Sequence, residues 1–271
     1  MSPHPIEILS ERFPQLLLPV REGMNQTEEY KSAVLRGEPV RRNPEFSMNP
    51  ADGLESFPTP AGEAEILYLE SREDFEHALR ALAYRCEPKP IPASLGATAI
   101  SGLIDWGKLR AHEDDFAEFI SDKKNYLSSL IILSSGEYSA VSAADVGLDE
   151  SEWRKKSVVI RRYHELAHFV SGRLFPQNKE AVRDEVIADL IGILAAFGYC
   201  REDLSKLFLG IEGEEYRQGG RLENYVAADS IESVTLRAKK LVSELCAFAG
   251  KNYSGDVFDF LIKVETEQIG I

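Results

Sequence analysis

The sequence is poor in cysteine and has no long apolar run. Its three cysteines, Cys86, Cys200 and Cys246, are far apart, and no CxxC spacing occurs. Neither a thiolate zinc site nor a disulfide framework is therefore indicated, and we expect a reducing cytoplasm as the compartment. The longest apolar run, near residues 190–200, is about half of the roughly 20 residues that span a bilayer. No basic leader precedes an apolar stretch at the start, so we predict no signal peptide and no membrane partner.

Positive charge is also scarce. The 271 residues include 31 Lys and Arg against 45 Asp and Glu, which gives a net charge of −14. Nucleic-acid phosphates and anionic lipid surfaces both require a basic protein surface, so we expect neither as a partner. A chain of this length with 44% hydrophobic residues can form one large domain or two small ones.

Proline is concentrated at the start of the chain and almost absent from its second half. Nine of the 13 prolines precede residue 61, and only Pro176 follows residue 92. Proline removes a backbone donor and interrupts regular structure. We therefore predict that residues 1–60 form an extended arm with short helical pieces at best. Such an arm either wraps the core or reaches another subunit, and the second case would make the protein a homo-oligomer.

From residue 61 the pattern of apolar residues becomes regular. Residues 63–70 read as a strand, and a helix with a capping-box-like start at Ser71 follows it. Residues 128–143 read as a strand, a turn at Ser135-Gly136 and a second strand. Residues 130–141 are placed to supply an edge strand that could hold an extended peptide, unless they form an ordinary core hairpin.

Helices are predicted for the rest of the chain. Asp149 is the expected N-cap of a long helix that ends at Gly172 or Pro176, and a second helix over 178–197 stops at Gly198. We expect an α+β fold in a single domain over 61–271, in which an α/β part over 61–145 precedes a helical part over 146–271.

The long helix carries a histidine pair. Residues 164–168 read His-Glu-Leu-Ala-His in a chain with only five histidines. Side chains four residues apart lie on one face of a helix, so His164 and His168 can bind one ion. Zinc prefers tetrahedral ligation, and a catalytic site keeps one position open. Glu165 lies one residue's rotation away, so it can reach a water on the metal rather than the metal itself.

The next helix supplies a carboxylate pair with the same spacing. Glu185 can complete the ligand set, and Asp189 can accept a hydrogen bond from a ligand histidine and fix its tautomer. An unpaired carboxylate in so apolar a helix would cost several kcal/mol. The alternative is a buried ion pair of Asp189 with Arg183 or Arg161.

The two motifs together resemble those of known zinc peptidases. HELAH at 164–168 followed by ExxAD at 185–189 and Gly192 is similar to the gluzincin metallopeptidases, in which HExxH pairs with a downstream ExxxD. The match is closer to the HtpX and CaaX-prenyl-peptidase group, which also has a later Gly-Tyr, as at 198–199 here. It is weaker to the ImmA/IrrE-type peptidases. The resemblance covers residues 155–202.

This resemblance implies a zincin-like fold with zinc held by His164, His168 and Glu185. It also implies that Glu165 is the general base and proton shuttle and that Asp189 orients a ligand histidine. HtpX-type enzymes carry membrane helices, which this sequence lacks, so their membrane substrates are not implied.

A peptidase also needs a donor for the oxyanion of its tetrahedral intermediate. Arg221 and Tyr225, in the segment GGRLENYV, are the candidates, with Tyr199 as a third. We therefore expect a soluble zinc-dependent hydrolase, most concretely a metallopeptidase that acts on a peptide or protein. The alternatives are a binding or regulatory protein that keeps the zinc only for structure or has lost it, and a metal-dependent hydrolase of another class.

Overall fold

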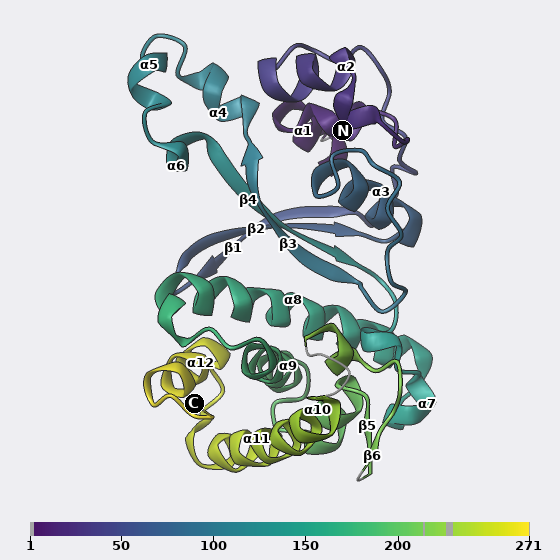
Figure 1. Cartoon of the computed structure of the whole chain (residues 1–271), viewed down its shortest axis with the longest axis vertical. Coiled ribbons are helices and arrows are strands. Elements are labelled where there is room, and N and C mark those ends of the chain that lie inside the picture. Colours follow the sequence, from purple (N-terminus) through teal and green to yellow (C-terminus); the bar gives the residue numbers. More distant parts are fainter. Residues whose placement is uncertain (1–2, 214, 226–229, 271) are drawn as a thin grey trace. The chain divides into compact units, whose positions relative to one another are not determined.

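The computed structural model describes residues 3–213, 215–225 and 230–270 and confirms an α+β fold. The chain forms two compact units: residues 1–57 with 64–135, and residues 58–63 with 136–271 (Figure 1). This division differs from the predicted one, in which residues 1–60 stood apart from a single domain over 61–271. None of the described helices combines the length and the apolar character that crossing a membrane requires.

The amino-terminal segment contains short helical pieces, as predicted, and these pack into the core of the first unit rather than forming a separate extended arm. It contains α1 (Pro5–Arg12), α2 (Glu28–Tyr30) and short 3-10 or π-helical turns over 14–17, 24–26 and 31–35. Pro5 lies in the first turn of α1, where the amide that proline lacks needs no partner. The prolines therefore start helical turns here, and the apolar residues between them are buried in the core of the first unit.

A four-stranded sheet has the order β1-β2-β4-β3. Strand β2 (Gly62–Leu69) pairs in parallel with β4 (Leu127–Ser134), and β3 (Ala97–Ile104) pairs antiparallel with β4. The outer strand β1 (Gly53–Thr59) lies next to β2. The remaining helices of the first unit are α3 (Arg72–Leu82), α4 (Trp106–Ala111), α5 (Phe116–Phe119) and α6 (Lys123–Tyr126).

The sheet contradicts the predicted hairpin over 128–143. Strand β4 has a partner on each side, so it is an interior strand and not a free edge. The predicted second strand is absent from these described residues; Tyr138–Ala140 form a 3-10 turn, and α7 (Ala143–Val146) follows. The cause is local, because Ser142 starts α7 by a capping box with Asp145.

The second unit is mainly helical, as predicted. Asp149 caps α8 (Glu150–Leu174), and Gly198 ends α9 (Ala181–Phe197) in the left-handed conformation expected of a C-terminal glycine. The other elements of this unit are a 3-10 turn over 176–178, α10 (Glu202–Phe208), the short strands β5 (Ile211–Glu212) and β6 (Glu215–Tyr216), the 3-10 turn η6 (Arg221–Asn224), α11 (Ile231–Asn252) and α12 (Val257–Thr266).

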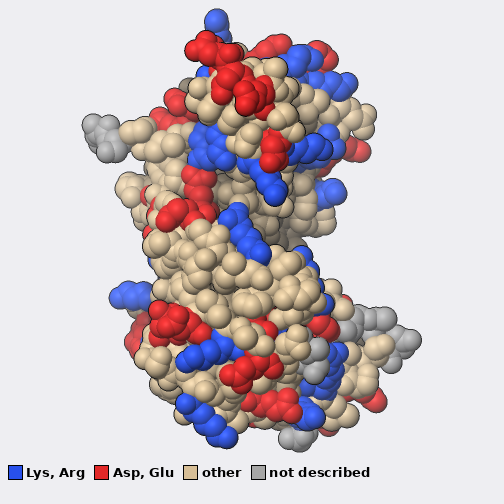
Figure 2. Space-filling model, turned by 90° about the vertical axis from the view of Figure 1, so that its left-hand side faces the viewer, with Lys and Arg blue, Asp and Glu red and all other residues tan. Residues whose placement is uncertain are grey.

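The surface is rich in charge of both signs. On the face drawn in Figure 2, basic side chains are interspersed with acidic ones and form no continuous basic surface among the described residues. This distribution agrees with the acidic balance of the sequence.

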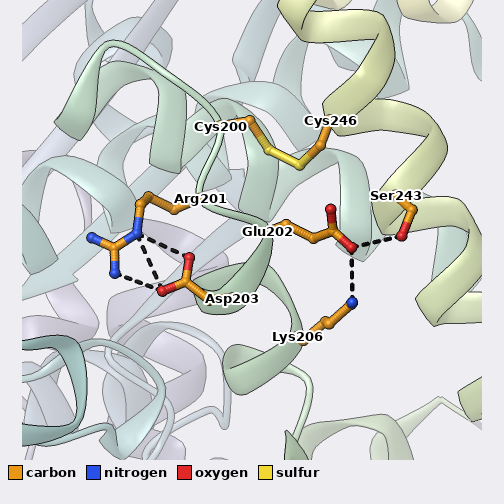
Figure 3. Close-up of a disulfide and its surroundings, with 7 residues drawn as sticks. All are labelled: Cys200, Arg201, Glu202, Asp203, Lys206, Ser243 and Cys246. Atoms are coloured by element: carbon orange, nitrogen blue, oxygen red, sulfur yellow. Dashed lines mark hydrogen bonds and ion pairs between the residues drawn. A yellow bond between two sulfur atoms is a disulfide. The ribbon is translucent and has the colours of Figure 1, made fainter. Parts of the chain in front are cut away.

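A disulfide joins Cys200 to Cys246, which corrects the expectation that the cysteines are unpaired. It connects the segment after α9 to α11, beside the hydrogen bond from Ser243 to Glu202 (Figure 3). Cys86 is free and buried, and burial raises the pKa of its thiol to about 12.

Replacing Cys200 and Cys246 with serine is expected to lower the free energy of unfolding by about 4 kcal/mol, because the disulfide closes a long loop. The two cysteines are 46 residues apart. Urea denaturation of the double variant and of the wild type, both without reductant, measures the difference. Equal stabilities, or failure to recover the two cysteine peptides joined in an unreduced digest, would contradict the pairing.

Helices α8 and α9 approach closely at Gly192. A Cβ atom on Gly192 would lie 2.7 Å from the carbonyl oxygen of Ile160 and 2.9 Å from its Cγ2. No side chain fits there without moving a backbone, so the absence of a side chain sets the spacing of the two helices. This spacing matters because each helix carries part of the site described below.

The substitution Gly192→Ala should therefore lower the free energy of unfolding by about 1–3 kcal/mol through overpacking. Gly250→Ala is the matched control, since a Cβ there meets open space in α11. That control should be stabilising by about 0.5–1 kcal/mol, because alanine favours helix. Thermal or urea unfolding distinguishes the two; equal effects would show that the helices do not depend on this contact.

Candidate metal centre

Helices α8 and α9 bring His164, His168 and Glu185 together, as the sequence predicted. The Nε2 atoms of the two histidines are 3.1 Å apart. Glu185 Oε2 lies 3.5 Å from His164 Nε2, and Glu185 Oε1 lies 3.2 Å from His168 Nε2. Within the described part of the chain, this is the one group of three or more His, Cys, Asp or Glu side chains with ligand atoms so close.

The spacing of these atoms fits a tetrahedral dication. Ligand atoms at about 2.0–2.1 Å from a tetrahedral zinc are about 3.3 Å from one another. The observed separations of 3.1, 3.2 and 3.5 Å lie close to that edge length, with the last two starting from different oxygens of Glu185. One ligand atom from each of the three residues lies within 4.8 Å of the others. Two imidazoles and one carboxylate are also the donor types that zinc accepts in catalytic sites. The residues present therefore fit the implied metal.

The ionisation of the two α9 carboxylates also favours a bound cation. Burial raises the pKa of Glu185, but the hydrogen bond from His168 and the charges of His164 and Arg221 outweigh burial and hold it well below its usual range. Burial likewise opposes ionisation of Asp189, yet Arg221 and His164 lower its pKa. Two carboxylates whose pKa values are lowered, Glu185 and Asp189, therefore face the single guanidinium of Arg221.

Asp189 determines which nitrogen of His164 faces the centre. Its Oδ1 lies 3.0 Å from His164 Nδ1. An ionised carboxylate can only accept, so Nδ1 carries a proton, and in the neutral ring Nε2 then keeps its lone pair. Because Nε2 faces His168 and Glu185, the ring is in the tautomer that a metal requires.

A tyrosine that the sequence analysis missed completes this network. Tyr138 donates its hydroxyl proton to Asp189 Oδ1 at 2.7 Å, and the hydroxyl lies 2.9 Å from His164 Nδ1. Arg221 donates to the Tyr138 hydroxyl at 3.2 Å and to Asp189 Oδ2. No spacing in the sequence connects Tyr138 to this site, since the network depends on the turn that replaced the predicted strand.

Among the described residues, Asp189 pairs with Arg221. Arg183, one of the alternatives considered, is fully buried and pairs with Glu265 at 2.9 Å. Arg161, the other, donates to the backbone carbonyls of Gly136 and Glu137. The cation of Asp189 is Arg221, so Asp189 bonds both to a ligand histidine and to an arginine.

The other predicted site residues lie in α8, at η6 and after the end of α9. Glu165 is buried on α8 directly after His164. Arg221 starts η6 and also lies 3.5 Å from Glu185 Oε2. Tyr225 caps η6; burial and the nearby Glu185 raise the pKa of its phenol despite the charge of Arg221. Tyr199 is exposed beside Phe197, and no contact places it in this network.

The chain belongs to DUF7005, a family of unknown function, whose match covers residues 2–256. No curated protein matches the chain. No solved structure matches it either. The family assigns no activity, so the chemistry of the site has to be argued from its residues.

Tyr138→Phe should weaken zinc binding by about 10–100-fold while the protein stays folded, because it removes one hydroxyl from the group that orients His164. Zinc affinity is measured by competition with a chromogenic chelator. Tyr253→Phe is the control, since its exposed hydroxyl bonds only to the carbonyl of Gly255 in the described structure. Equal affinities of the Tyr138 variant and the wild type would show that the hydroxyl does not orient the ligand.

Proposed function

We propose that this protein is a zinc-dependent hydrolase of gluzincin type with a zincin-like catalytic region, and most concretely a metallopeptidase. One observation carries the proposal: one ligand atom each from His164, His168 and Glu185 lies within 4.8 Å of the other two. The HExxH and ExxAD spacing supports it, because it places a carboxylate beside the ligand histidines.

His164, His168 and Glu185 would hold the zinc. A bound zinc supplies Lewis acidity, which polarises a carbonyl and lowers the pKa of water toward about 7. Glu165 takes the proton of the attacking water on its carboxylate and delivers it to the leaving amine. Glu165 is buried next to His164 in the sequence, which suits it to this role. Electrostatic interactions are stronger at low local dielectric, so its carboxylate would interact more strongly with the attacking water and the leaving amine.

Arg221 and Tyr225 are suited to stabilise negative charge that develops on the substrate. Arg221 is fixed by its bonds to Asp189 and Tyr138, so it requires little reorganisation. Tyr225 has a raised pKa, and its hydroxyl therefore stays protonated and able to donate.

The cytoplasmic location, the peptide or protein substrate and a homo-oligomer remain predictions, as does the absence of nucleic-acid and membrane partners.

Two measurements test the proposal. The wild type should contain one zinc per chain by atomic emission, and His164→Ala should contain none. Glu165→Gln should keep its zinc and lose at least about 100-fold in hydrolysis, because only the proton carrier is removed. Hydrolysis is followed as new termini in a proteome-derived peptide library, detected by mass spectrometry.

The outcomes separate this proposal from its main rival. An undiminished rate in Glu165→Gln would refute the mechanism. If the wild type and Glu165→Gln both contain zinc but the wild type cleaves nothing, a binding or regulatory protein with a structural zinc would be favoured. A wild type that takes up no zinc would refute the metal centre itself.

A further inference from the structure

A cavity of about 260 Å³ has His168 of the candidate metal centre in its wall. Asp184, which precedes Glu185 in α9, lines it as well. Both histidines of the centre and the cavity belong to the second unit, so its position does not depend on the first. The cavity therefore shares His168 with the centre, and a group held in it would lie beside that residue.

The size of the cavity suits a single side chain. Sites for whole small molecules usually measure about 300–1,000 Å³. Phe175 and Ile187 line part of the wall and provide apolar surface for an aliphatic chain. The rest of the lining includes charged groups, so the occupant must carry a polar end.

One carboxylate in this lining, Asp184, makes only long contacts with charged and polar groups. Glu265 is also in the wall, but Arg183 neutralises it at 2.9 Å and Asn178 donates to it at 3.0 Å. Asp184 accepts one long hydrogen bond, at 3.3 Å, from the amide of Glu180. Its nearest recorded cation is Arg183 at 3.9 Å, which is already bound to Glu265. Asp184 is therefore the group in this wall best placed to accept a cationic ligand.

We propose that this cavity binds a lysine or arginine side chain of a peptide substrate, with the aliphatic stem on Phe175 and Ile187 and the cationic end at Asp184. The inference rests on the proposed function, because it assigns a substrate class to that same site. Lys179 also lines the cavity, but it is exposed and its ammonium can remain in water.

Binding to zinc-loaded Glu165→Gln tests the proposal without turnover. The probes are alanine pentapeptides that carry lysine, norleucine or glutamate at one position, which is varied along the peptide. At one position lysine should bind about tenfold more tightly than norleucine, because only lysine adds a charge to the same stem. Adding Asp184→Asn should remove this difference, since asparagine keeps the acceptor for the Glu180 amide and loses the charge.

The control is Lys179→Ala, which should keep the preference for lysine. Equal binding of lysine and norleucine at every position, or a preference that survives Asp184→Asn, would overturn the proposal. Tighter binding of glutamate would assign the cavity to Lys179 and overturn it as well. If wild-type protein binds the lysine peptide but never cleaves it, the cavity is supported and the proposed hydrolase fails.

Discussion

Asp189 places a negative charge inside a helix that is otherwise apolar, and the arrangement of the site follows from how that charge is satisfied. Its side chain is fully buried, so each of its oxygens needs a donor. His164 and Tyr138 serve one oxygen, and Arg221 serves the other. Three separate segments are therefore held at fixed positions around α9. The neutral imidazole of His164 then carries its proton on Nδ1, toward Asp189, and its lone pair on Nε2, toward His168.

The same requirement explains why two carboxylates four residues apart on α9 have different environments. Glu185 is partly open and faces both histidines, whereas Asp189 is enclosed behind them. Forming a buried ion pair costs desolvation of both groups, but removing one partner leaves an uncompensated buried charge and is strongly destabilising. Arg221 contacts both carboxylates, so it couples the enclosed one to the one that faces the centre.

Much of this site could be predicted because it depends on spacing within helices. Asp149 and Gly198 identify the ends of α8 and α9, and the four-residue spacing places His164 and His168 on one face. Tyr138 could not be predicted in this way. Its position depends on a turn between β4 and α7, and local propensity favoured a strand there.

The errors in the fold have similar physical causes. Proline was interpreted as a breaker over 1–60, but Pro5 and Pro14 both occupy first-turn positions. Strand β4 was expected at an edge, yet sheet order depends on pairing between distant segments, which apolar alternation does not encode. The pairing of Cys200 with Cys246 also depends on the tertiary fold, because 46 residues separate them.

The β1–β2 turn has a consequence for dissecting this protein. Residues 58–63 belong to the second unit, although the sequence on both sides of them belongs to the first. Ala61 packs against the core of the second unit, and its carbonyl accepts a hydrogen bond from Arg173. The chain therefore passes between the units three times, and no single cut yields either one intact. A fragment that begins at residue 136 would lack a piece of its own core, so an autonomous form of the second unit would need this turn grafted back.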